Sequence, residues 1–237
     1  MQTTSSPTSS RRSLGRESLA LALWAALAGL FVLFAFYGAS QEDGPDEALY
    51  DPELAIGGVF VYGLVVGLAL AIGQLYPRPR HDLGFRRFGA RWVWIGLGVV
   101  VLSLIVARIA EPYLHGGEQQ GFAPERWEPE HAAAFVANSV LVILIGPFAE
   151  EVFFRGLGVR ALSVFGTAAA VVVSGVVFGL AHGILGALLP LAVFGIGLGW
   201  VRARSGSVWP CVIAHTAYNG LGILLLVLAW VLDVPLE

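Results

Sequence analysis

The sequence predicts an all-α fold, a polytopic transmembrane helical bundle of about seven spans, and two observations carry that prediction. Hydrophobic residues make up 57% of the chain and charged residues only 13%, whereas an average soluble domain has about 45–50% and about 25%. Uncharged apolar runs recur along the chain, and several reach the roughly 20 residues that a helix needs to cross the hydrocarbon core. These runs do not alternate apolar and polar residues as the strands of a membrane barrel do, so helices are expected.

Seven segments form the expected spans. The first span follows an arginine pair, as the apolar region of an export signal would. Its apolar run of about 21 residues is longer than the 7–15 residues of a signal peptide, so a retained helix is favoured. The spans are Leu19–Ala39, Leu54–Tyr76, Trp92–Ala110, Ala132–Ala149, the stretch between Arg160 and His182, Gly183–Val201, and the stretch between Arg204 and Asp233.

The connections between these spans alternate in charge, and the alternation predicts an orientation. Arginines gather in the N-terminal tail, in 77–91, after the fourth span and after the sixth, whereas acids dominate 41–53 and 111–130. Because arginine-rich connections stay cytoplasmic, we expect the N-terminus inside and the C-terminus outside. The expected location is the cell membrane, and the abundance of arginine without lysine suggests a bacterial cytoplasmic membrane.

The same patterns divide the chain into three parts. Residues 1–16 are polar and rich in Ser and Thr, and are expected to form a disordered cytoplasmic tail. Residues 17–131 hold three variable N-terminal transmembrane helices, and 132–237 hold a core of about four. The net charge of -3 provides no basic field for nucleic acid. With Cys211 as the single cysteine, no disulfide within the chain is possible.

Ionisable groups at membrane depth cost at least about 2.5–3.5 kcal/mol each, so they usually serve a function. Glu150 and Glu151 are adjacent and project about 100° apart on a helix, so they cannot point the same way. Arg155 is four residues after Glu151, which places these two on one face as a pair. That pairing would neutralise one acid and leave Glu150 for separate work, with Pro147 loosening the helix just before it.

Two later spans carry further polar groups. His182 ends the run Phe178-Gly179-Leu180-Ala181-His182, and His215 and Asn219 are four residues apart on one helix face. Each motif also has a plain structural interpretation. The acid pair would merely mark the cytoplasmic end of the fourth helix, and His182 would be a hydrogen-bonded packing residue. Three such motifs on three spans of one small membrane protein favour a common polar site inside the membrane.

The order Glu-Glu-x-x-x-Arg, Phe-x-x-x-His and His-x-x-x-Asn resembles the signature of the CPBP (Abi) family of intramembrane proteases. That family includes the CAAX prenyl endopeptidase and proteins linked to bacteriocin maturation and immunity. The resemblance runs from about Ala132 to Leu226, and includes Phe153-Phe154-Arg155-Gly156 and Ser205-Gly206-Ser207-Val208-Trp209-Pro210.

The resemblance implies an intramembrane endopeptidase that cuts a membrane-associated peptide or a prenylated CAAX-type protein from the cytoplasmic side. Glu150 would activate a water that His182 helps to orient, and His215 and Asn219 would line the oxyanion site. Glu151 and Arg155 would hold the helix and the cavity in shape.

The family's two proposed mechanisms, glutamate-based and metal-based, leave the cofactor open. No His-Glu-x-x-His zinc motif occurs in the chain. Glu150, His182 and His215 could still bind a catalytic zinc ion, but Glu151, the remaining base, has Arg155 as its obvious partner. No firmly bound metal is therefore expected, with zinc as the alternative.

A second class of function is non-catalytic, namely an immunity or scaffold membrane protein of the Abi type. Such a relative would be expected to lose one of the motif residues, and this chain has all of them. A small transporter ranks third because the sequence shows no repeat symmetry.

Overall fold

The computed structural model describes residues 7–40, 48–114, 124 and 126–233. Within these ranges every regular element is a helix and no strand occurs, which confirms the predicted polytopic helical bundle. The α-helices are α1 (Pro7–Ala39), α2 (Pro52–Gly73), α3 (Pro79–Asp82), α4 (Arg91–Leu114), α5 (Ala132–Val140), α6 (Gly146–Glu150), α7 (Val159–Leu162), α8 (Thr167–Leu180), α9 (Leu188–Ser205) and α10 (Trp209–Leu232).

Five segments of the described chain are long and apolar enough to cross a membrane, so the expected seven spans are corrected to five full-length candidates. They are Leu14–Ala39, Pro52–Gly73, Arg91–Leu114, Pro129–Phe165 and Trp209–Leu232. The expected fifth span is α8, whose 14 residues reach only about 21 Å. The expected sixth is α9, with 18 residues. Hydropathy does not reveal this shortening, because the turn between the two helices is itself mostly apolar.

The first helix begins earlier than the sequence predicts. α1 starts at Pro7, so helix extends into the segment 1–16 that was expected to be disordered, and residues 1–6 lie outside the described chain. Extending an existing helix by one residue requires much less free energy than nucleating a new one. The long apolar helix can therefore extend into the polar residues that precede it.

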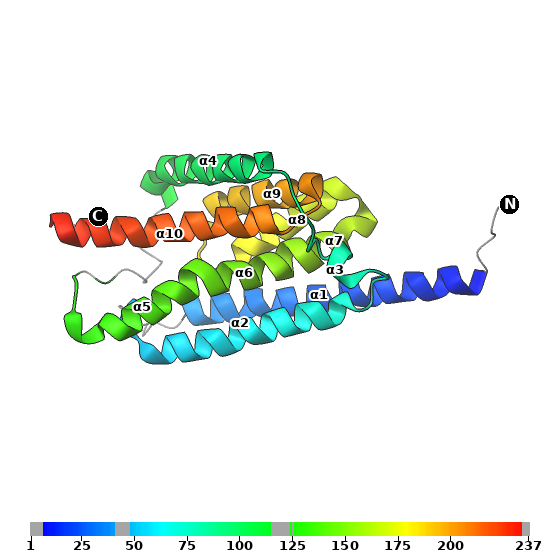
Figure 1. Cartoon of the computed structure of the whole chain (residues 1–237), viewed down its shortest axis with the longest axis horizontal. Coiled ribbons are helices and arrows are strands. Elements are labelled where there is room, and N and C mark those ends of the chain that lie inside the picture. Colours follow the sequence, from blue (N-terminus) through cyan, green and yellow to red (C-terminus); the bar gives the residue numbers. More distant parts are fainter. Residues whose placement is uncertain (1–6, 41–47, 115–123, 125, 234–237) are drawn as a thin grey trace.

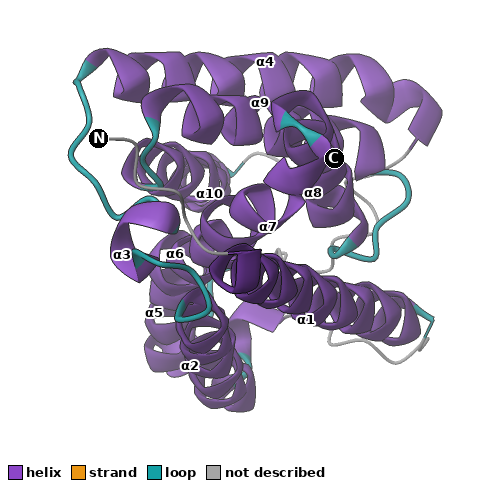
Figure 2. Cartoon of the chain, turned by 90° about the vertical axis from the view of Figure 1, so that its right-hand side faces the viewer, coloured by secondary structure: helices purple, strands orange, loops and turns teal. Residues whose placement is uncertain are grey.

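The helices surround a central hairpin formed by α8 and α9. Figure 1 shows α2, α10 and the run from α5 to α7 extended along the long axis, and the run from α5 to α7 contacts both α2 and α10. Figure 2 shows α4 along the side of the bundle opposite α1 and α2. The core lies between these layers and includes Trp24, Phe153, Phe178, Phe194 and Leu198.

The fourth span does not end at the acid pair. The chain stays helical from Ala132 to Leu162, and two π-helical segments, Leu141–Ile145 and Glu151–Gly158, interrupt the α-helical geometry. Every residue of the second segment is buried. The acids therefore lie inside a long helical segment and not at its end.

The backbones of α8 and α9 touch at two glycines. A Cβ added at Gly175 would lie 2.4 Å from the backbone nitrogen of Ile196, and one at Gly195 would lie 2.5 Å from the carbonyl oxygen of Gly175. Small residues allow this close approach, which is a main source of helix association inside a membrane. The hairpin therefore depends on these two positions.

We expect Gly175→Ala to destabilise the protein, because the methyl group would meet backbone atoms that cannot move independently. Forcing extra volume into a packed interior costs about 1–3 kcal/mol. Thermal unfolding in detergent measures the effect, and Gly67→Ala is the control because nothing lies within 4 Å of that Cβ. Equal unfolding temperatures for the two variants would contradict the close contact.

Candidate active site

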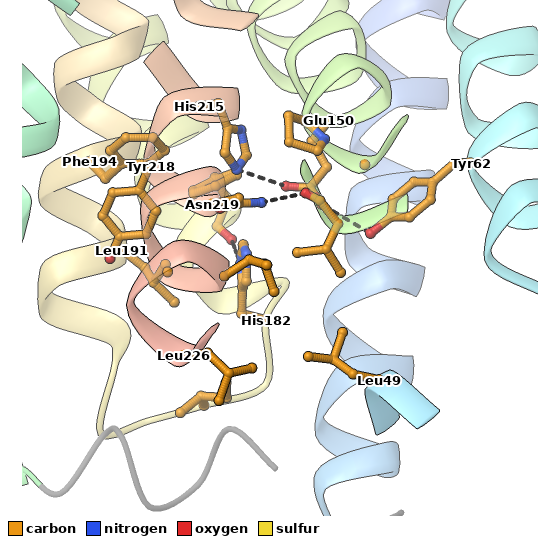
Figure 3. Close-up of a pocket in the computed structure, with 17 residues that line it drawn as sticks. Leu49, Tyr62, Glu150, His182, Leu191, Phe194, His215, Tyr218, Asn219 and Leu226 are labelled. Atoms are coloured by element: carbon orange, nitrogen blue, oxygen red, sulfur yellow. Dashed lines mark hydrogen bonds and ion pairs between the residues drawn. The ribbon is translucent and has the colours of Figure 1, made fainter. Parts of the chain in front are cut away.

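Four of the six predicted site residues line one cavity of about 350 Å³. Glu150 comes from α6, His215 and Asn219 come from α10, and His182 follows the end of α8. Figure 3 shows their polar groups directed toward a common space. The other two predicted residues, Glu151 and Arg155, lie behind the cavity wall.

Glu150 presents its carboxylate to the cavity, and its side chain is 21% exposed. One oxygen, Oε1, accepts a hydrogen bond from the Tyr62 hydroxyl at 3.3 Å. The other oxygen, Oε2, lies 4.0 Å from Nε2 of His215 and has no hydrogen-bond partner among the described residues. One oxygen of Glu150 is therefore held by Tyr62, and the other is buried beside His215 without a hydrogen bond to a described residue.

Glu151 is held in a different environment. Its side chain and that of Arg155 are both 0% exposed, and Nη1 of Arg155 donates to Oε1 of Glu151 at 2.8 Å. Arg155 also donates to the carbonyl of Gly195 and lies over the ring of Phe178, 4.2 Å from its centroid. The ion pair predicted from the four-residue spacing is present, and Arg155 balances the charge of Glu151.

His215 connects the two acids. Its Nδ1 lies 2.9 Å from Oε1 of Glu151, the oxygen that also accepts from Nη1 of Arg155. An ionised carboxylate only accepts hydrogen bonds, so Nδ1 of His215 is the donor. Its Nε2 is then directed to the cavity and to Glu150. This tautomer is assigned from the hydrogen-bond network.

His182 reaches the cavity because α8 ends early. Its Nδ1 donates to the carbonyl of Phe178 at 2.8 Å, since a carbonyl can only accept, and this leaves Nε2 as the remaining ring nitrogen. The turn continues through Gly183, which has a φ of 70° and packs against the backbone of Ala35 in α1. The sequence alone left the depth of His182 open. The early end of α8 places it on the wall of the cavity that Glu150 and His215 also line.

Asn219 donates a hydrogen bond to a backbone carbonyl that has no partner within the irregular helix. In the first π-helical segment the N–H of Gly146 bonds to the carbonyl of Leu141, and Pro147 has no N–H to offer. The carbonyl of Val142 is thereby left without a helical partner, and it accepts from Nδ2 of Asn219 at 2.8 Å. The amide carries a second N–H that remains for the cavity.

The sequence interpretation missed Tyr62 of α2. It is the single tyrosine of α2 and lies in the uncharged apolar run that follows Glu53, and that isolated hydroxyl was the only signal available. The rest of the lining is largely apolar and extends along α10 past Asn219. It includes Leu49, Ile184, Leu191, Ile223 and Leu226.

The side chains that could bind a metal ion do not form a cluster in this arrangement. Within the described ranges no three His, Cys, Asp or Glu side chains are grouped so that they could hold a metal ion. Both histidines have already committed Nδ1, and Nε2 of His215 is 4.0 Å from the nearest oxygen of Glu150. A zinc ion bound by Glu150, His182 and His215 at about 2.0–2.2 Å would use the Nε2 atoms of both histidines, and the three side chains would have to move closer together than they lie here.

Residues 132–221 match a family model described as type II CAAX prenyl endopeptidase, Rce1-like. No curated protein and no solved structure gives a significant match. The matched segment begins at the residue where the sequence places the start of its core, and it contains all six predicted site residues. Together with the five apolar helices, it supports a multi-pass membrane protease of the CAAX type in general. The resemblance carried by the three motifs is thus confirmed over residues 132–221, which match the Rce1-like family model, a finding consistent with the CPBP family.

Proposed function

We propose that the protein is an intramembrane endopeptidase in which Glu150 activates a water for attack on a peptide carbonyl. The observation that carries this proposal is the contrast between the two adjacent acids. Glu151 is fully buried and paired with Arg155, whereas Glu150 lines the cavity and its side chain is 21% exposed. Of the two carboxylates, only that of Glu150 reaches the cavity in which a water and a peptide bond would meet.

The reaction begins when Glu150 takes a proton from a water molecule while the oxygen of that water attacks the scissile carbonyl carbon. The carbonyl π electrons move to oxygen, and the resulting tetrahedral intermediate carries a negative charge there. The proton on Glu150 then passes to the leaving nitrogen as the carbon–nitrogen bond breaks. Nε2 of His182 is the remaining polar atom of that ring, and it accepts a hydrogen from the water to orient it.

His215 and Asn219 stabilise the oxyanion. Asn219 offers its second N–H, and Nε2 of His215 donates whenever the ring carries both protons. A preorganised donor to an oxyanion, in a site from which water is largely excluded, is commonly worth about 2.7–4 kcal/mol.

The shape and depth of the cavity fit a substrate that is partly apolar. His215 is the seventh residue of α10, so it lies about 9 Å from the arginine-rich end of that helix. From there the apolar lining extends toward Leu49 and Leu226. We propose that the scissile bond enters from the arginine-rich end, which the charge pattern assigns to the cytoplasm, and that apolar side chains or a prenyl chain occupy the deeper part.

Glu150→Gln should lower peptidase activity by about 10²–10⁴-fold, the usual contribution of a general base. The substitution keeps the size and shape of the side chain, so the unfolding temperature and membrane abundance should stay unchanged. Glu53→Gln, on the exposed start of α2, is the matched control. Activity is measured on a membrane-tethered reporter peptide, and a Glu150→Gln variant that still cleaves it would contradict the proposal.

Arg155→Ala should act on stability instead. It leaves Glu151 charged and buried without its ion pair, a state that costs about 3–5 kcal/mol. Arg160→Ala is the control, because its ion pair with Glu17 is partly exposed and worth about 0–1 kcal/mol. Membrane abundance and thermal unfolding measure both variants. If Glu150→Gln loses as much abundance as Arg155→Ala, both acids are structural.

Chelation should leave most of the activity in place, because we propose that the histidines hold a water and not an ion. Purified protein treated with a strong chelator is assayed for peptidase activity, and elemental analysis is run on the untreated sample. Well under one metal per chain is expected. Stoichiometric zinc, with activity lost on chelation and restored by zinc, would make Glu150, His182 and His215 its ligands.

A further inference from the structure

A polar group from outside the Rce1-like segment contacts the proposed base. Tyr62 lies in α2, and its hydroxyl donates to Oε1 of Glu150 at 3.3 Å across the interface between α2 and α6. Figure 3 shows its ring entering the cavity from the side opposite His215. The family match covers neither this residue nor its helix, so the contact comes from the N-terminal part of the chain that the match leaves out.

The backbone of α6 makes room for this ring. A Cβ at Gly146 would lie 3.1 Å from the hydroxyl oxygen of Tyr62 and 3.2 Å from its Cζ atom. Gly146 is four residues before Glu150, so it lies one helical turn away on the same face. The ring therefore packs on α6 at the turn that presents the carboxylate, and its position is set independently of the hydrogen bond.

We infer that Tyr62 is a positioning residue for Glu150, an inference that rests on the proposed function. A glutamate carboxylate rotates freely about its last bond unless one oxygen is held. The hydroxyl holds Oε1, and Oε2 is then directed to the space beside Nε2 of His215, 4.0 Å away. Tyr62 acts through Glu150 and takes no part in bond making or breaking.

The kinetic test compares Tyr62→Phe with the wild type in the reporter-peptide assay. The variant removes the hydroxyl and keeps the ring on Gly146, so the unfolding temperature and KM should stay the same. The value of kcat should fall about tenfold, the effect of losing a hydrogen bond to a charged group. Tyr76→Phe is the control, because the buried hydroxyl of Tyr76 has no hydrogen-bond partner among the described residues.

Gly146→Ala tests the same contact from the other side. Its methyl group should displace the ring of Tyr62 and lower kcat, and adding Tyr62→Phe should then cause little further loss. Gly63→Ala is the control, since nothing lies within 4 Å of that Cβ. A KM that rises at constant kcat in Tyr62→Phe would overturn the inference, because Tyr62 would then bind substrate. The inference would also be overturned if Tyr62→Phe lowered the unfolding temperature and lost activity only in proportion to the loss of folded protein.

A second readout needs no protease activity. A hydrophobic carbodiimide modifies carboxylic acids inside membranes, and mass spectrometry separates modification at Glu150 from that at Glu151. The Tyr62 hydroxyl occupies Oε1 of Glu150, so Tyr62→Phe should free that oxygen, label Glu150 faster and leave Glu151 unchanged. Unchanged labelling of Glu150 overturns the inference. Faster labelling in a protein that cleaves no peptide supports the contact and refutes the proposed function.

Discussion

The ion pair between Glu151 and Arg155 is the interaction on which the rest of the structure depends. Taking two charges out of water costs several kcal/mol per ion, and only close geometry and further hydrogen bonds recover that cost. Here Arg155 also donates to Gly195 in α9 and lies over Phe178 in α8, while Glu151 accepts from His215 in α10. Satisfying one buried pair thus holds three other helices around it.

That pair also separates the roles of two adjacent carboxylates. Because neighbouring side chains on a helix diverge by about 100°, Glu151 is directed into the protein and Glu150 into the cavity. His215 lies between them, with Nδ1 toward Glu151 and Nε2 toward Glu150. The ionised Glu151 fixes the orientation of the ring, and the ring then faces the proposed base with a defined nitrogen.

Irregular backbone supports the site in two further places. The π-helical segment before Pro147 leaves the carbonyl of Val142 for Asn219, and buried backbone groups that lose a helical partner need such a replacement in a membrane. The early end of α8 is the second irregularity, because it leaves His182 in a turn at the level of the cavity. π-helical segments and interrupted helices often occur at functional sites for this reason.

The sequence by itself determined the membrane class, the helical fold, the ion pair at four-residue spacing and the common face of His215 and Asn219. Each follows from composition or from the period of one helix. Only the tertiary structure decided that α8 is short, that His182 joins the cavity, and that Tyr62 contacts Glu150. Those features depend on where the chain turns within an apolar run and on which helices pack together. A pattern confined to one helix cannot contain that information, because the partner of each side chain lies on another.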